Sequence, residues 1–280
     1  MTRKCVLSLV IIFFILCLAL PALAKETNQA EKPWKRFNLK LGGSANTTDS
    51  SVRLGAKGVG LEVNVEDALN LDTSTTSFFI EGYWRFMKRR RHRLDFSWLS
   101  FSRSGEAILG RDITIGDLPM LKGTQVNTNL DFDMYRVGYS YSFFQDDRID
   151  LGVGVGLYIL PVSFDITASG LVNGAESESI TAPLPVINLR ADFAITPRWL
   201  LLTRFDLFYF EISNFRGGIT DTSIAVEYNP FKNVGFGLKV NSFKMRVEAE
   251  GEDYPSLDFF GSFEYANLGA MLYLNFFFGK

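Results

Sequence analysis

The stretch Arg148–Ile159 reads "RIDLGVGVGLYI", and apolar residues alternate strictly with polar or small ones along it. Side chains of an extended strand point alternately to opposite faces, so this period of two predicts a β-strand with one apolar face. The apolar face would carry Ile149, Leu151, Val153, Val155, Leu157 and Ile159. The run "GVGVG" (Gly152–Gly156) is not expected to be a dinucleotide loop, because that motif needs a helix directly after it.

The same alternation recurs on both sides of this stretch, at 78–86, 187–195, 234–241 and 270–278. Connections between the segments are short at 87–92, 144–148, 196–198 and 229–232, and long near 65–75, 104–124, 168–178, 212–220 and 249–257. Strands of about ten residues with tight turns at one end and long loops at the other are typical of a transmembrane β-barrel. We therefore predict an all-β, antiparallel up-and-down barrel.

Counting from Val52 gives ten strands, with the segment Arg36–Ala45 left over. That segment is either the lower half of a long first strand or part of an extra hairpin, which would make twelve strands. Aromatic residues gather beside the short turns, as expected for a girdle at a membrane–water interface. Short turns lie on the periplasmic side of such barrels, so this girdle should be the periplasmic one.

Residues 1–24 have the pattern of a cleaved signal peptide. Arg3 and Lys4 precede an apolar run, which ends in the small-x-small motif Ala22-Leu23-Ala24. Cleavage would leave 25–280 as one barrel domain without cysteine, since Cys5 and Cys17 are the only two in the chain. The remaining 27 basic and 31 acidic residues give a net charge of −4, which argues against a nucleic-acid partner. The expected location is the outer membrane, with its lipid and lipopolysaccharide as partners.

Several segments resemble a family of proteobacterial outer-membrane barrels of largely uncharacterised role. They are "VEDALNLD", "EGYWRFMKRRRHRLDFSWLSFSRSG", "RDITIGD" and "YRVGYSYSFFQDDRIDLGVGVGL", and together they cover about 59–160. In fold, the chain is similar to small barrels such as OmpW and the OmpA transmembrane domain. The last alternating segment, which ends at Phe278, resembles the signal that the barrel-assembly machinery reads, so this machinery is an implied partner during biogenesis.

The only histidine, His92, lies in the basic turn "MKRRRH", among four arginines and a lysine. A histidine base needs a nucleophile and an orienting carboxylate nearby, and no such set is evident in the sequence. We therefore predict no catalytic residues and no enzymatic activity. With one histidine and no mature cysteine, we also predict no metal site and no cofactor. The turn is interpreted as a solvated one that meets anionic lipid head groups.

The alternation of side chains, or parity of residue numbers along each strand, places six cations and six anions on the inward face of the strands. They are Glu81, Arg85, Arg93, Asp95, Arg136, Asp150, Arg190, Asp192, Arg204, Asp206, Glu227 and Lys239. Charges removed from bulk water need partners, so this set predicts a network of ion pairs in the lumen. The function suggested first is a narrow channel or small-solute transporter. The alternative is a barrel with a closed lumen and a structural or surface-interaction role. The sequence predicts no particular oligomeric state.

Overall fold

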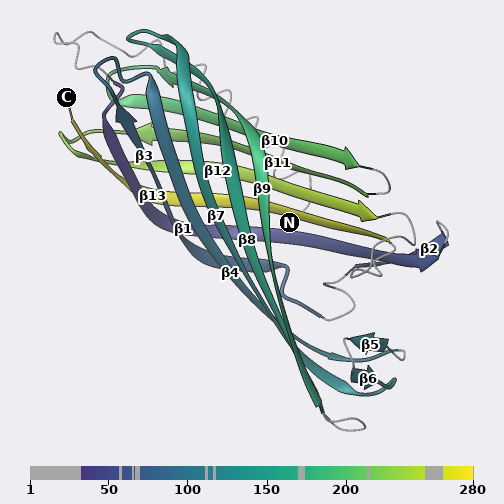
Figure 1. The fold of residues 1–280 in the computed structure, drawn as a ribbon. Helices are drawn as coiled ribbons and strands as arrows, with labels where there is room; N and C mark the ends of the chain where they lie inside the picture. Colours follow the sequence, from purple (N-terminus) through teal and green to yellow (C-terminus); the bar gives the residue numbers. More distant parts are fainter. Residues whose placement is uncertain are drawn as a thin grey trace.

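The computed structural model describes residues 33–56, 59–64, 66, 70–110, 113–115, 118–169, 174–212, 215–249 and 261–279. The predicted signal peptide lies outside these residues. Ten long antiparallel strands form the barrel (Figure 1). In chain order they are β1 (Phe37–Ala56), β3 (Ser74–Phe86), β4 (His92–Ile108), β7 (Gln125–Gln145), β8 (Ile149–Ser169), β9 (Gly174–Ala194), β10 (Trp199–Ile212), β11 (Phe215–Tyr228), β12 (Val234–Ala249) and β13 (Gly261–Phe278).

The sheet closes on itself because β1 pairs with both β3 and β13. The predicted count of ten is confirmed. The leftover segment Arg36–Ala45 is the lower part of β1, which runs unbroken for 20 residues. Three short strands are not among these ten. β2 (Val59–Asn64) pairs antiparallel with the outer end of β1, and β5 (Ile113–Ile115) pairs only with β6 (Leu118–Met120) in the described part of the chain.

The four predicted short turns join neighbouring strands at one end of the barrel. Two predicted long loops are shorter than expected. β10 continues to Ile212 and β11 begins at Phe215, while β8 continues to Ser169 and β9 begins at Gly174. The sequence prediction ended these strands early because polar and small residues replace the apolar ones there. That change marks the level where the wall leaves lipid, and the ladder of backbone hydrogen bonds continues beyond it.

An apolar belt covers the outer face of the barrel. Val155 on β8, Ile187 on β9 and Leu272 on β13 are 60%, 60% and 67% exposed. Exposed apolar surface that encircles a closed barrel is the surface that faces lipid. Trp84, Tyr139, Tyr141, Phe143, Phe236 and Phe278 are exposed beside the short turns. Among the described residues, no helix has the length and apolarity that a membrane span requires.

A second aromatic group lies at the edge of the belt nearer the long loops. The sequence analysis did not predict this group. The Trp98 and Tyr135 rings stack with centroids 6.4 Å apart, and Phe78 meets Trp98 edge-on at 6.5 Å. Tyr209 on β10 is 63% exposed. Two girdles on either side of an apolar band are characteristic of transmembrane barrels.

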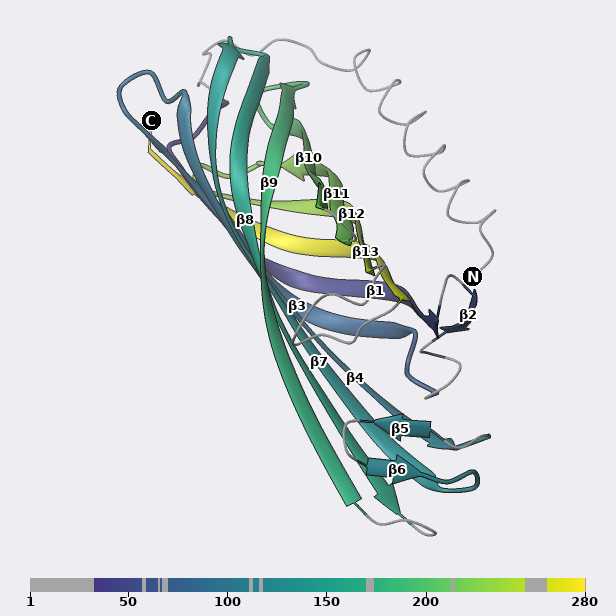
Figure 2. The same cartoon turned by 45° about the vertical axis from the view of Figure 1, so that its right-hand side comes forward.

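β9 and β10 separate in their outer halves. Their ladder runs from Leu200↔Ala194 to Leu207↔Ile187, whereas the β8–β9 ladder continues to Ala168↔Gly174. Figure 2 shows the outer ends of β7, β8 and β9 leading away from those of β10–β13. Pro183 and Pro185 follow directly beyond the last pair. Proline has no amide hydrogen to donate to a ladder and is confined to edges of sheets.

Candidate functional site: the barrel interior

The lower cluster of charges fills the lumen near the short turns. Its three arginines and three aspartates come from β3, β4, β8 and β9: Arg85, Arg93, Asp95, Asp150, Arg190 and Asp192. Arg85 Nη1 lies 2.6 Å from Asp150 Oδ2, and Arg190 Nη1 lies 3.1 Å from the same oxygen. Arg93 reaches from β4 to Asp192 on β9, at 3.2 Å. Each charge therefore lies within an alternating lattice of opposite charges.

A second group of charges, the upper cluster, lies further along the lumen toward the long loops. Four cations and four anions belong to it: Lys40, Glu81, Arg136, Arg204, Asp206, Asp221, Glu227 and Lys239. Arg204 is its centre, because its three guanidinium nitrogens lie 3.7, 3.2 and 3.1 Å from oxygens of Glu81, Asp206 and Asp221. Glu81 also accepts hydrogen bonds from two lysines, Lys40 at 3.2 Å and Lys239 at 2.5 Å.

Asp206 of the upper cluster has no exposed surface, and both a cation and neutral side chains bond to its carboxylate. Arg136 donates to its two oxygens from Nε and Nη2, at 2.7 and 3.0 Å. Asn188 donates at 2.6 Å, and the Tyr158 hydroxyl lies 2.8 Å away. A buried carboxylate is stable only when its oxygens are bonded in this way.

Some of these ion pairs join residues on one strand or on neighbouring strands, and others cross the lumen. Lys239 on β12 meets Glu81 on β3, and Arg136 on β7 meets Asp206 on β10. Strands that are not neighbours in the sheet are thus joined through the interior. Arg136 is only 1% exposed although it lies inside the barrel, because the surrounding side chains pack closely around it.

An aromatic layer lies above the charges and also crosses the lumen. The Phe132 ring on β7 meets the Tyr265 ring on β13 with centroids 5.1 Å apart. Tyr158 on β8 and Phe243 on β12 approach to 6.0 Å, and Phe243 has no exposed surface. These residues belong to one buried apolar cluster with members on β3, β4, β7, β8, β9, β11, β12 and β13.

Trp34 closes the mouth of the lumen at the end with the short turns. The indole is 5% exposed and packs against Ala194 and Leu200, on the opposite side of the opening from the start of β1. Its Nε1 donates to the carbonyl oxygen of Asp146 in the β7–β8 turn, at 2.6 Å. Its ring centroid lies 5.8 Å from Arg85 Cζ, so the tryptophan covers the lower charge cluster directly.

At the outer end of the lumen, Glu66 folds inward and is 4% exposed. It lies 2.6 Å from Arg103 Nη1 and accepts hydrogen bonds from the Ser50 amide and hydroxyl at 2.9 and 2.6 Å. Burial alone would raise the pKa of Glu66, but the hydrogen bonds from Ser50 and Arg103 outweigh it and hold this pKa below its ordinary value.

Comparisons with known proteins bear on the fold. No protein-family model matches the chain, and no curated protein matches it in sequence. Among solved structures, the outer membrane protease OmpT from Escherichia coli is similar with a TM-score of 0.57 and 10% identity, covering 91% of this chain and 100% of that one. The Pseudomonas putida toluene transporter TodX matches at 0.35 and 9% identity, covering 87% and 90%. Ail of Yersinia pestis matches at 0.32 and 11%, covering 85% and 99%.

The OmpT likeness, the apolar belt and the closed sheet agree. The protein is an outer-membrane β-barrel. At this level of identity the likeness shows the fold alone, and the two lower TM-scores carry no argument. The activity of the barrel must therefore be argued from its own residues.

All twelve charged residues that parity placed inside lie in the barrel interior, and each takes part in at least one ion pair. Four further interior charges were missed, namely Lys40, Glu66, Arg103 and Asp221. Parity was sufficient to find Arg103 and Asp221, which lie an even number of residues from Asp95 and Glu227 on the same strands. With these four, the described residues of the interior include eight cations and eight anions.

His92 belongs to the lower girdle of this outer-membrane barrel. Its Nδ1 lies 2.7 Å from the Tyr139 hydroxyl, and its ring meets those of Phe86 and Tyr141 at 5.5 and 5.1 Å. No carboxylate bonds to His92 within the described ranges. The described residues also contain no group of three or more His, Cys, Asp or Glu that could hold a metal ion.

Proposed function

We propose that this barrel does not conduct and that it acts at the cell surface, through the part of the wall beyond the apolar belt. The observation that carries the proposal is the lattice of ion pairs across the lumen. A selective pore lines its constriction with rings of one charge and keeps a hydrated path. Here each charge is neutralised by a partner, and an aromatic layer and Trp34 lie above and below the lattice. The channel suggested by the sequence is thereby the less favoured function.

The outer extension supports the second half of the proposal. β7, β8 and β9 are 21 residues long, whereas β10 and β11 are 14. Because the apolar belt needs only about ten residues of each strand, the long strands continue well beyond lipid. Their outer halves continue past the end of the β9–β10 ladder, still paired with β4, and β9 forms the edge of the sheet there (Figure 2). An exposed sheet with a free edge is suited to contact with another macromolecule.

Planar-bilayer recording of the refolded protein tests the proposal. The parent should give no steps of conductance. Arg204→Ala removes the cation that lies among three carboxylates, so it should hydrate the lumen and open a small, cation-preferring leak. Arg198→Ala removes an exposed cation from the β9–β10 turn and should stay silent. Stable conductance of the parent would show that the lumen is open and that the proposal is wrong.

A further inference from the structure

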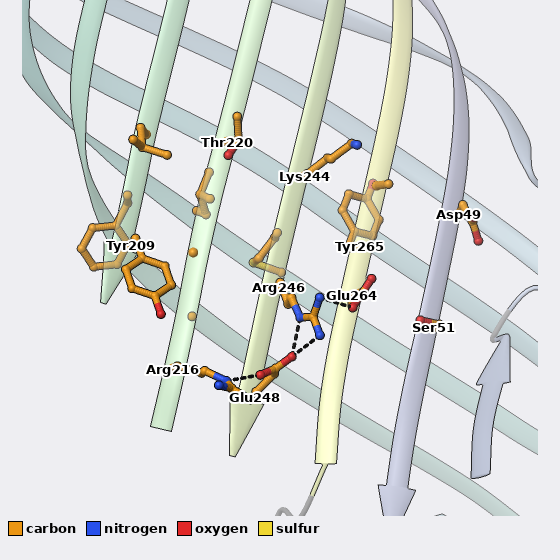
Figure 3. Close-up of a pocket in the computed structure, with 17 residues that line it drawn as sticks. Asp49, Ser51, Tyr209, Arg216, Thr220, Lys244, Arg246, Glu248, Glu264 and Tyr265 are labelled. Carbon is orange, nitrogen blue, oxygen red and sulfur yellow. Dashed lines mark hydrogen bonds and ion pairs between the residues drawn. The ribbon is translucent and has the colours of Figure 1, made fainter. Parts of the chain in front are cut away.

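A hollow of about 1120 Å³ lies on the outer wall of the barrel, across β10–β13 and β1 (Figure 3). Its outward-facing lining includes Tyr209, Thr220, Lys244, Arg246, Glu264 and Ala266. Gly218 carries no side chain on the outward face of β11, which keeps the floor of the hollow low. Most of the lining residues face outward, whereas Ile219, Met245 and Tyr265 of the same strands belong to the interior cluster and separate the hollow from the lumen.

The position of the hollow relative to the apolar belt shows which layer of the membrane surrounds it. Three residues of the apolar belt border the hollow on the side of the short turns: Leu268 on β13, Val240 on β12 and Leu207 on β10. Their side chains are 39%, 41% and 42% exposed. From Leu268 to Glu264 the chain rises by four residues, or about 13 Å along the strand. The hollow therefore begins where the belt ends, on the side of the long loops. Lipid head groups of the outer leaflet lie at this level.

The charges in the hollow have mixed signs. Glu248 pairs with the guanidinium groups of both Arg216 and Arg246, and Arg246 Nη1 lies 3.0 Å from Glu264 Oε1. The side chain of Arg246 is nevertheless 61% exposed, so part of its guanidinium faces outward. No carboxylate pairs with Lys244 in the part of the chain that the structure describes. The carboxylates hold the arginine in place, while Lys244 keeps its donors for a ligand.

We propose that this hollow binds the phosphorylated sugar head group of an outer-leaflet glycolipid. Lys244 and Arg246 supply charge-assisted hydrogen bonds to phosphate. Glu264 and Asp49 supply acceptors for sugar hydroxyls, and Tyr209 supplies an aromatic face at the edge. The acyl chains continue downward along the apolar belt. A simple phospholipid head group offers few hydroxyl donors to these carboxylates, and it is too small to fill such a hollow.

Binding of defined lipids to the refolded protein in detergent, followed by native mass spectrometry, tests the proposal. The parent should bind bisphosphorylated lipid A at least tenfold more tightly than its dephosphorylated form or phosphatidylglycerol. Lys244→Gln should weaken binding of the phosphorylated form by about tenfold, since a hydrogen bond to a charged group is lost. Lys232→Gln, the same change at an exposed position in the β11–β12 turn, should leave affinity unchanged.

A second variant tests the shape of the hollow without changing its charge. Ala266→Trp places a large ring on the floor and should weaken lipid A binding as much as Lys244→Gln does. Neither variant touches the interior, so both should fold like the parent. Equal binding of lipid A and phosphatidylglycerol would overturn the proposal in favour of a general attraction for anionic lipid. Unchanged binding by Ala266→Trp would also overturn it, because the ligand would then lie elsewhere.

Discussion

Asp206→Asn is the substitution that tests the sealed interior most sharply. The side chain keeps its shape and loses its charge, so packing is preserved. Arg204 would retain Asp221 and Glu81 as partners. Arg136 would lose the only carboxylate within ion-pair distance among the described residues, and it is 1% exposed. Breaking a buried pair by neutralising one member costs roughly 3–5 kcal/mol, because the other charge stays buried without compensation.

Equilibrium unfolding by urea in lipid vesicles would measure this loss, provided that folding and unfolding curves coincide. We expect the free energy of unfolding to fall by about 3–5 kcal/mol for Asp206→Asn. Asp147→Asn is the matched control. It makes the same chemical change in an exposed turn, and it should shift stability by less than about 0.5 kcal/mol.

A double variant separates the ion pair from other effects of the substitution. Arg136→Met removes the charge that Asp206→Asn leaves unpaired, so the double variant should be more stable than the sum of the two single losses predicts. The coupling should reach about 1–3 kcal/mol. A loss below about 1 kcal/mol for Asp206→Asn, with no coupling to Arg136→Met, would mean that water solvates Arg136. The sealed lumen would then be refuted.

Three further predictions concern the wall, the mouth and the orientation. Val155→Arg places a charge on the lipid face and should reduce folding stability in vesicles by roughly 2–4 kcal/mol if the site lies near the midplane, whereas Phe231→Arg in an exposed turn should cost about 1 kcal/mol or less. Trp34→Ala should remove a blue-shifted component from the fluorescence spectrum and lower the urea midpoint, because the indole covers a buried charge cluster. A cysteine at Gly110 should react with a membrane-impermeant thiol reagent on intact cells, and one at Lys88 should not; the reverse result would invert the barrel.

Most of the fold was predictable from alternation alone. On β8, one face carries Val153, Val155 and Leu157, and all three are exposed to lipid as predicted. The period of two survives in a barrel because lipid and lumen impose opposite demands on successive residues. The strand ends were less predictable. Once the wall leaves the membrane both faces can be polar, so the period disappears although the backbone ladder continues through Ser169 and Gly174.

The interior site was predictable in composition and less so in connectivity. Parity identifies which charges face inward, but which ones meet depends on the stagger between strands that are distant in sequence. The pair Lys239–Glu81 joins strands on different sides of the lumen, and no local signal predicts it. Lys40 was missed because its segment could not be assigned to a strand. Trp34 was missed because it precedes β1 and acts through tertiary contacts, outside any periodic pattern.

The charged interior has a cause that does not require transport. A chain exported to the outer membrane must not contain a long apolar run, because such a run would be read as a membrane helix. Polar residues at every second position satisfy this demand, and in a ten-stranded barrel they all face a narrow lumen. There they must pair, because burying unpaired charge costs far more than pairing it returns. Equal numbers of cations and anions among the described interior residues, each with a partner of opposite charge, are thus the expected result of a polar face enclosed in a small barrel. The features that such constraints leave unexplained lie outside the lumen. They are the outer halves of β7, β8 and β9 and the hollow around Lys244, and both proposals for function rest on them.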